Sequence, residues 1–429
     1  MRRVFLALAV FAVLLSLLFG LLFAAACIPN TLLASRFTDS ALTYSQTDAY
    51  AIPENGRLSG IIDNYADSIL LNVSWQMGKG APLSAVLDTD YYNGDELGLN
   101  AGLYLAVTED AEPNTDYSRY WHGTAMFVRF LHLFTDVTGI RWIGFSLILL
   151  TALLTLAMLL RRRHGDLALF LLLSLLTVQI WNLRLSVEFQ PSFLLTFLFC
   201  PLFLVHEAKN DFRLVLLAVA GGTAAAFFDF LTTETTTILL PLLLVTAVRA
   251  KEGRLGSVRK NLLLYLQCGL CWNGSYAGTF LVKWTAASLA TGENAFIQAL
   301  SSVGERIGGA VELGESSPTS FFSAITANLT VLFGGTSRLD PARVFLGTAI
   351  VLGILFSVWY LFRKPDGERN GALLLLLLGA MVFLRYLLLN NHSYLHAFFT
   401  YRALLCPIFA LLAALRLHIA LPQRKKGKR

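Results

Sequence analysis

Long apolar runs are the feature of this sequence that most restricts its fold. The runs Val4 to Ile28 and Leu373 to Leu389 contain only one charged residue between them, Arg385. About 20 such residues in a helix cross the hydrocarbon core of a bilayer. Over the whole chain 55% of residues are apolar and 14% are charged, whereas about a quarter are charged in a soluble domain. The sequence therefore predicts an all-α, polytopic membrane protein and excludes disordered, collagenous and disulfide-rich secreted chains.

The apolar runs predict about ten transmembrane helices separated by two long extracytoplasmic loops with interfacial helices. The predicted parts are a first helix in 1–28, a loop in 29–139, helices two to seven in 140–282, a second loop in 283–343, helices eight to ten in 344–421, and a basic tail in 422–429. The segments 214–228 and 235–248 are short for a bilayer. They form either one long helix or a hairpin, and the hairpin keeps both flanking basic clusters on one side.

The distribution of Lys and Arg predicts the orientation. Alternate connections carry twenty basic residues, whereas the three short connections on the other side carry only Arg184 and Arg402. Because basic residues stay in the cytoplasm, both termini are expected there, in a plasma-membrane protein. The net charge of +6 fits this rule, so no nucleic-acid partner is expected. The first run ends in Ala24-Ala25-Ala26-Cys27, similar to a lipoprotein cleavage site, but it is longer than a signal sequence and is predicted to be retained.

The first extracytoplasmic loop is acidic and contains a candidate catalytic pair. Between Pro29 and His122 it has thirteen carboxylates and four basic residues. Apolar residues from 61 to 77 recur at helical spacing, which predicts an amphipathic helix opened by Ser59 as N-cap. Asp63 and Asp67 then share one face. They are interpreted either as a general base or cation-binding pair at the membrane surface, or as part of a solvated helix face.

A second acidic segment has the composition of a calcium loop. It is Asp88-Thr-Asp90-Tyr-Tyr-Asn93-Gly-Asp95, and it misses the EF-hand spacing by one residue. The segment is interpreted as a surface turn, with a divalent-cation site as the alternative.

The last extracytoplasmic loop combines His392, Tyr394, His396 and Arg402 at the membrane boundary, close to Arg385. In a helical turn the two histidines face the same way. One interpretation is a phosphate-binding site, because arginine offers a forked set of donors. The alternatives are a two-histidine metal site without an identifiable third ligand, and an aromatic belt with interfacial histidines.

The layout resembles the GT-C superfamily of integral membrane glycosyltransferases. The similar segments are Asp63-Asn-Tyr-Ala-Asp67, Arg119-Tyr-Trp-His122-Gly, Phe228-Asp229-Phe-Leu-Thr, and His392-Ser-Tyr-Leu-His396 through Arg402. The resemblance implies transfer of a sugar from a polyprenyl-phosphate donor to a glycan, lipid or protein acceptor of the cell envelope, at the extracytoplasmic face. The alternatives are a transporter or flippase of lipid-linked sugars or other envelope precursors, and a structural protein of the envelope.

The resemblance also implies roles for residues. Asp63, assisted by Asp67, would take the proton of the acceptor hydroxyl, and cationic side chains would hold the phosphate as it leaves. The predicted substrate-binding residues are Arg119, His122, Arg385, His392, Tyr394, His396 and Arg402. No cofactor is assigned, and a divalent cation is left open.

Overall fold

The structure is a computed structural model of the chain. It describes residues 1–228, 231–306, 320–338 and 369–418, together with 341–343, 345, 347–349, 351–352 and 359. Asp229, most of the predicted eighth span (344–362) and the basic tail (422–429) lie outside the described residues.

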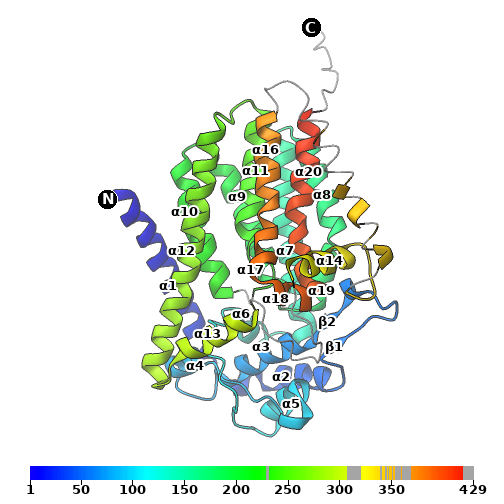
Figure 1. Cartoon of the computed structure of the whole chain (residues 1–429). Helices are drawn as coiled ribbons and strands as arrows, with labels where there is room; N and C mark the ends of the chain where they lie inside the picture. The colour runs from blue at the N-terminus through cyan, green and yellow to red at the C-terminus, as the bar shows by residue number, and fades with distance from the viewer. Residues whose placement is uncertain are drawn as a thin grey trace.

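Long helices form a bundle that fills one half of the molecule (upper part of Figure 1). Its helices are α1 (Arg2–Ala26), α7 (Val137–Arg161), α8 (Gly165–Thr177), α9 (Pro191–His206), α10 (Asp211–Phe228), α11 (Thr236–Lys251), α12 (Val258–Thr291), α16 (Arg369–Ala380) and α20 (Leu405–His418). Among the described residues, five helical stretches are long and apolar enough to cross a membrane: Arg2–Ala26, Val137–Arg161, Asp211–Phe228, Arg369–Leu388 and Ala397–Leu417. This supports a helical membrane protein, while ten spans and their orientation stay predictions.

Shorter elements cover one end of the bundle, called here the covered end (lower part of Figure 1). They are α2 (Asn30–Ser45), β1 (Tyr50–Ala51), β2 (Ile62–Asp63), α3 (Asn64–Gln76), α4 (Pro82–Asp88), α5 (Leu99–Thr108), α6 (Thr124–Leu131), α13 (Ala295–Arg306), α14 (Phe321–Leu332), α17 (Val382–Leu388), α18 (Asn390–Leu395) and α19 (Ala397–Thr400), with the 3-10 turns η1 (Leu58–Gly60), η2 (Asp95–Leu97), η3 (Ile180–Leu185) and η4 (Tyr401–Leu404). The two short strands pair antiparallel, with Tyr50 opposite Asp63.

The segment 211–251 forms two helices, α10 and α11, as the hairpin interpretation requires. The end of α10 and the start of α11 both lie toward the covered end (Figure 1). A continuous helix through this segment is therefore excluded.

The amphipathic helix predicted from residue 61 to residue 77 of the acidic loop begins later than expected. Ser59 belongs to the turn η1, and α3 starts at Asn64 with Asp63 as its N-cap. The Asp63 carboxylate accepts a hydrogen bond from the N–H of Ala66 at 2.9 Å. The prediction of Ser59 as the cap was wrong, because an aspartate four residues later satisfies the free N–H groups of the helix equally well.

A buried arginine joins the bundle to the covered end. Arg129 in α6 has no exposed surface and donates to the carbonyl oxygens of Ala25, Ile28 and Ser74 and to the side chain of Asn30. These carbonyls lie at or near the carboxyl ends of α1 and α3, where helical partners are missing. A guanidinium satisfies several of them at once and complements the helix dipoles.

Ion pairs connect the bundle helices at the opposite end. The buried carboxylate of Glu207, after α9, pairs with Arg162, Arg249 and Arg254. This network fixes the ends of α7, α9 and α11 relative to one another.

Candidate functional site

A long groove runs along the bundle between α11, α12 and α16 and reaches α13 and α17 at the covered end. We call it the α12 groove. Its volume is about 830 Å³, which lies in the range of ligand-binding cavities. Most of its wall is aliphatic: Ile238, Leu239, Leu242, Leu262, Leu266, Leu270, Leu281, Leu377, Leu378, Met381, Leu384 and Leu388. The groove can therefore accommodate a long apolar ligand.

Aromatic side chains on α12 form a continuous row along this groove. Tyr265, Trp272, Tyr276, Phe280 and Trp284 all contribute to its wall, because spacings of four or seven residues keep them on one helix face. The ring centroids of Trp272 and Tyr276 are 4.9 Å apart, those of Tyr276 and Phe280 5.2 Å, and those of Phe280 and Trp284 5.8 Å. The row leads from the middle of the bundle to the covered end.

Two arginines flank one aromatic ring where the groove meets the covered end. The guanidinium carbon of Arg119 lies 5.4 Å from the ring centroid of Tyr120, and that of Arg306 lies 5.6 Å from the same centroid. Both side chains line the groove. Within the described part of the chain neither forms an ion pair, and the buried Nε of Arg119 has no hydrogen-bond partner. Arg119 and Arg306, called here the arginine pair, therefore offer their positive charge to an anionic group in the groove.

A third arginine in the groove wall is already paired. Arg385 donates from Nε to Glu234 Oε1 at 2.9 Å and from Nη1 to Ser393 Oγ at 2.9 Å, and its Nη2 bonds the carbonyl of Leu231. Glu234 also lines the groove and is 4% exposed. Arg385, a predicted substrate-binding residue, lines the groove and also holds the start of α11 against α17 and α18.

Asp67, the predicted assisting base, is completely enclosed. Its carboxylate accepts hydrogen bonds from Arg141 (2.8 Å), Tyr44 (2.9 Å) and Ser186 (2.7 Å). Two further donors are backbone N–H groups at 3.1 Å, those of Val187 and Glu188. With five donor groups, Asp67 joins α2, α3, α7 and the η3 to α9 connection. The interpretation of Asp63 and Asp67 as part of a solvated helix face was therefore wrong, because both side chains are buried.

Asp63, the predicted base, is 3% exposed. Burial, partly offset by the Ala66 N–H bond, raises the pKa of its carboxyl to about 7. A carboxylate with a pKa near neutral pH is suited to general-base catalysis. Asp63 does not belong to the wall of the α12 groove.

The two histidines of the last loop lie together as predicted, with ring centroids 4.7 Å apart. Burial is the largest cause that lowers the pKa of both groups, and the pKa of His396 falls to about 4, with Arg306 and Arg338 also contributing. Both rings are therefore neutral at pH 7 and can offer hydrogen bonds, but no charge, to a phosphate. Tyr394 lies beside Arg338, with its ring centroid 5.6 Å from the guanidinium carbon.

Arg402 and His122 are both buried, but only His122 lies beside Tyr120, with the two ring centroids 6.1 Å apart. Arg402 is 1% exposed and lies 4.7 Å from the Phe189 ring centroid, with Ser59 O as a distant acceptor at 3.5 Å. The first and last loops thus meet here, but Arg402 is not part of the groove wall. His122 contacts Tyr117 O at 3.3 Å, and burial lowers the pKa of its ring well below the usual value.

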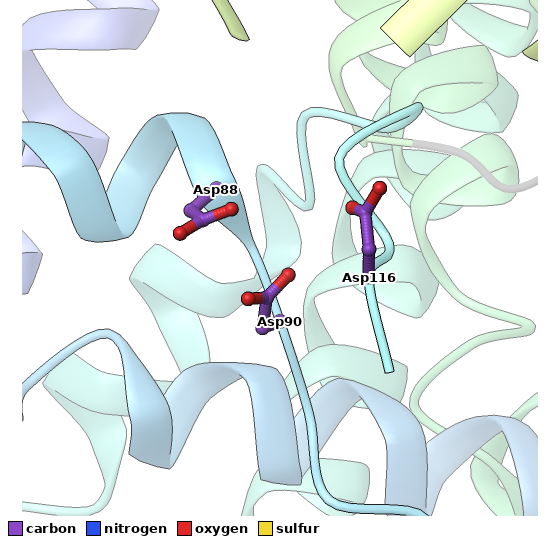
Figure 2. Close-up of side chains that lie close together, drawn as sticks. All are labelled: Asp88, Asp90 and Asp116. Atoms are coloured by element: carbon purple, nitrogen blue, oxygen red, sulfur yellow. The ribbon is translucent and has the colours of Figure 1, made fainter. Parts of the chain in front are cut away.

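Three carboxylates cluster at the covered end (Figure 2). Oxygen atoms of Asp88, Asp90 and Asp116 lie within 4.8 Å of one another. Burial, followed by the charges of Asp88 and Asp116, raises the pKa of Asp90 to about 7. This acidic cluster could hold a divalent cation. Gln298 of α13 donates to Asp116 at 2.6 Å, so the cluster is tied to the helix that carries Arg306.

The predicted calcium loop is therefore assembled differently from the sequence interpretation. Asn93 and Asp95 form a surface turn in which the Asn93 side chain accepts from the Asp95 N–H at 2.7 Å. Asp88 and Asp90 join Asp116 instead. Asp116 comes after α5 in the sequence, whereas Asp88 and Asp90 come before it. Only folding therefore brings the three carboxylates together.

Sequence analysis missed two groove residues, Arg306 and Glu234. Arg306 lies in α13, within the second predicted extracytoplasmic loop, where apolar residues recur at helical spacing but no site residue was predicted. In the sequence, Glu234 is only a carboxylate just before an apolar run, and the fold shows that it pairs with Arg385 in the groove wall.

Comparison of the chain with known protein families, with curated proteins and with solved structures gives no match.

Proposed function

We propose that this protein is a membrane glycosyltransferase of the GT-C type, which moves a sugar from a polyprenyl-phosphate donor to an acceptor of the cell envelope. In this proposal it spans the plasma membrane about ten times, with both termini in the cytoplasm and the covered end outside. The α12 groove carries the proposal, because one cavity combines an aliphatic and aromatic wall with the arginine pair at one end.

The two parts of the groove match the two parts of the donor. The polyprenyl chain would lie along the leucines and the aromatic row of α12, within the depth of the bilayer. Arg119 and Arg306 would bind the phosphate at the extracytoplasmic boundary, since guanidinium groups bind phosphate oxygens through paired N–H donors. The sugar would then project toward the covered end.

The reaction itself needs little more than correct placement of charge. The bond between sugar C1 and the phosphate oxygen breaks, and the phosphate leaves with the electron pair. The arginine pair stabilises the negative charge that grows on this phosphate, while a carboxylate takes the proton of the acceptor hydroxyl. Should a divalent cation take part, the acidic cluster of Asp88, Asp90 and Asp116 offers oxygen ligands of the type that such ions prefer.

The position of the charged groups favours an enzyme over a flippase. A flippase moves the polar sugar through the bilayer and needs polar groups along the whole path. The charged residues of the groove wall lie at its covered end: Arg119, Glu234, Arg306 and Arg385. Leu242, Leu262 and Leu266 form the other end.

The test is sugar transfer by purified protein in lipid nanodiscs, with polyprenyl-phosphate-linked sugars as donors and envelope glycan or lipid acceptors. We expect release of polyprenyl phosphate that depends on an acceptor. In vesicles, the same protein should not move a fluorescent lipid-linked sugar between leaflets. Leaflet exchange without transfer would contradict the proposal and favour the flippase.

A further inference from the structure

We propose that Glu234 is the general base of this reaction, the group that takes the proton of the acceptor hydroxyl. This inference rests on the proposed glycosyltransferase function and identifies a catalytic residue within the same groove.

Glu234 is held in the groove wall with one oxygen unused. Its Oε1 accepts from Arg385 Nε at 2.9 Å, and its buried Oε2 has no hydrogen-bond partner among the described residues. The residue is 4% exposed and contributes to the wall of the α12 groove. A buried carboxylate oxygen without a donor is costly. A ligand hydroxyl in the groove would supply the missing donor.

The surroundings of Glu234 fix this oxygen in place. Arg385 is itself bound to Ser393 Oγ and to the Leu231 carbonyl, so the ion pair has little freedom to rotate. Thr237 Oγ1 bonds the Glu234 carbonyl and accepts from the indole N–H of Trp272 at 3.0 Å. A carboxylate held in this way keeps Oε2 at one position in the groove wall, and a base requires such a fixed position for efficient proton transfer.

The same cavity contains the complementary charges. Arg119 and Arg306 line it together with Glu234. A donor phosphate on the arginine pair and an acceptor hydroxyl on Oε2 would therefore occupy the same groove. Asp63 and Asp67 do not line this cavity, and the Asp67 carboxylate is saturated by its own donors. The geometry thus favours Glu234 over both aspartates of the sequence-based assignment.

The proposed step balances without a further reactant. The acceptor O–H proton moves to Glu234 Oε2 while the acceptor oxygen bonds to sugar C1. The C1–O bond to the phosphate breaks, and its electron pair leaves with the polyprenyl phosphate on the arginine pair. Glu234 then releases the proton to water or to the departing phosphate, which restores the carboxylate.

The experiment compares Glu234→Gln with two matched variants in the nanodisc transfer assay. Glutamine keeps an Oε1 acceptor for Arg385 but cannot take a proton. Glu188→Gln is the control, because Glu188 is also a buried carboxylate (3% exposed) and lies outside the groove wall. Asp63→Asn tests the earlier assignment. Thermal unfolding and the affinity for polyprenyl phosphate are measured for all three.

We expect Glu234→Gln to lower the turnover rate by about 100-fold or more, the usual contribution of a general base, and to remove the acid limb of the pH–rate profile. Affinity for polyprenyl phosphate should change by less than about threefold, and Glu234→Asp should regain part of the rate with its acid limb. Glu188→Gln should stay within about threefold of the wild type, and Asp63→Asn should retain the acid limb that Glu234→Gln loses.

The possible failures are distinguishable. Normal turnover by a folded Glu234→Gln protein overturns the inference and leaves the glycosyltransferase proposal intact. If Asp63→Asn loses turnover, and if the acid limb of the pH–rate profile is absent from that variant only, Asp63 is the general base. If the Glu234→Gln protein does not fold, Glu234→Asp becomes the test of the inference. This variant must then lower the turnover rate while its affinity for polyprenyl phosphate stays unchanged. If the wild type neither transfers sugar nor binds polyprenyl phosphate, both proposals fall.

Discussion

The carboxylate of Glu234 and the guanidinium of Arg385, 151 residues apart in the sequence, form an ion pair with 2.9 Å between Oε1 and Nε. Their side chains are 5% and 2% exposed. The pair joins the start of α11 to α17 beside the α12 groove.

Removal of the cation from this pair should destabilise the protein strongly. Arg385→Met leaves the Glu234 carboxylate buried without its partner, and such changes cost about 3–5 kcal/mol. We expect a clear fall in the thermal unfolding temperature in detergent. The double variant with Glu234→Gln should recover part of the loss, because the uncompensated charge is gone. Equal unfolding temperatures for Arg385→Met and the wild type would show that the pair contributes nothing.

Asp67 should behave as a structural residue. Asp67→Asn leaves Arg141 without its carboxylate and weakens the bonds from Tyr44 and Ser186, so we expect a loss of roughly 3 kcal/mol. Asp39→Asn is the matched control, since Asp39 is 53% exposed in its pair with Arg36 and exposed pairs contribute about 0–1 kcal/mol. Thermal unfolding of the two variants provides the comparison. Similar small shifts for both would contradict the structural role.

Arg129 should stabilise the junction between the bundle and the covered end. Arg129→Met removes the donors to Ala25, Ile28 and Ser74, and unsatisfied buried carbonyls cost about 1–3 kcal/mol each. Hydrogen exchange should rise at the carboxyl ends of α1 and α3 before it rises in α11. Exchange that increases uniformly over all helices would contradict this local role.

The acidic cluster should make stability depend on pH. The folded-state pKa of Asp90 is raised to about 7, above about 3.9 in an unfolded chain. A raised pKa means that folding favours the protonated form. This contribution is complete below about pH 4 and is lost as the pH rises to about 7.

The variant Asp90→Asn tests this dependence, because it keeps the neutral form at every pH. We expect it to unfold at a higher temperature than the wild type at pH 8 and to lose that advantage near pH 4. Unfolding is measured with EDTA present, so that no cation neutralises the carboxylates. A variant less stable than the wild type at pH 8 would show that the three carboxylates do not repel one another.

The sequence predicted the class of the fold and part of the site. Uncharged runs and helical periodicity are local properties, so the helical membrane protein and the break between α10 and α11 could be predicted. The proximity of His392 and His396 followed from their spacing alone.

The parts of the site that the sequence did not predict depend on contacts between distant segments. Asp63 and Asp67 share a short sequence motif, yet one caps a helix and the other is enclosed by α2, α7 and the connection after η3. Arg306 and Arg119 are almost 190 positions apart in the sequence and flank one tyrosine only after folding. No residue pattern predicts such a pairing. The N-cap was misplaced because Ser59 and Asp63 are both good caps.

The most direct test of the central claim is the binding of polyprenyl phosphate and of the uncharged polyprenol to the protein in nanodiscs. We predict that polyprenyl phosphate binds at least about tenfold more tightly, and that Arg119→Gln with Arg306→Gln removes this preference. Arg184→Gln, in a residue outside the groove wall, should retain it. Equal affinity of the wild type for the two lipids, or a preference that survives in the double variant, would contradict the assignment of the α12 groove as a lipid-phosphate site.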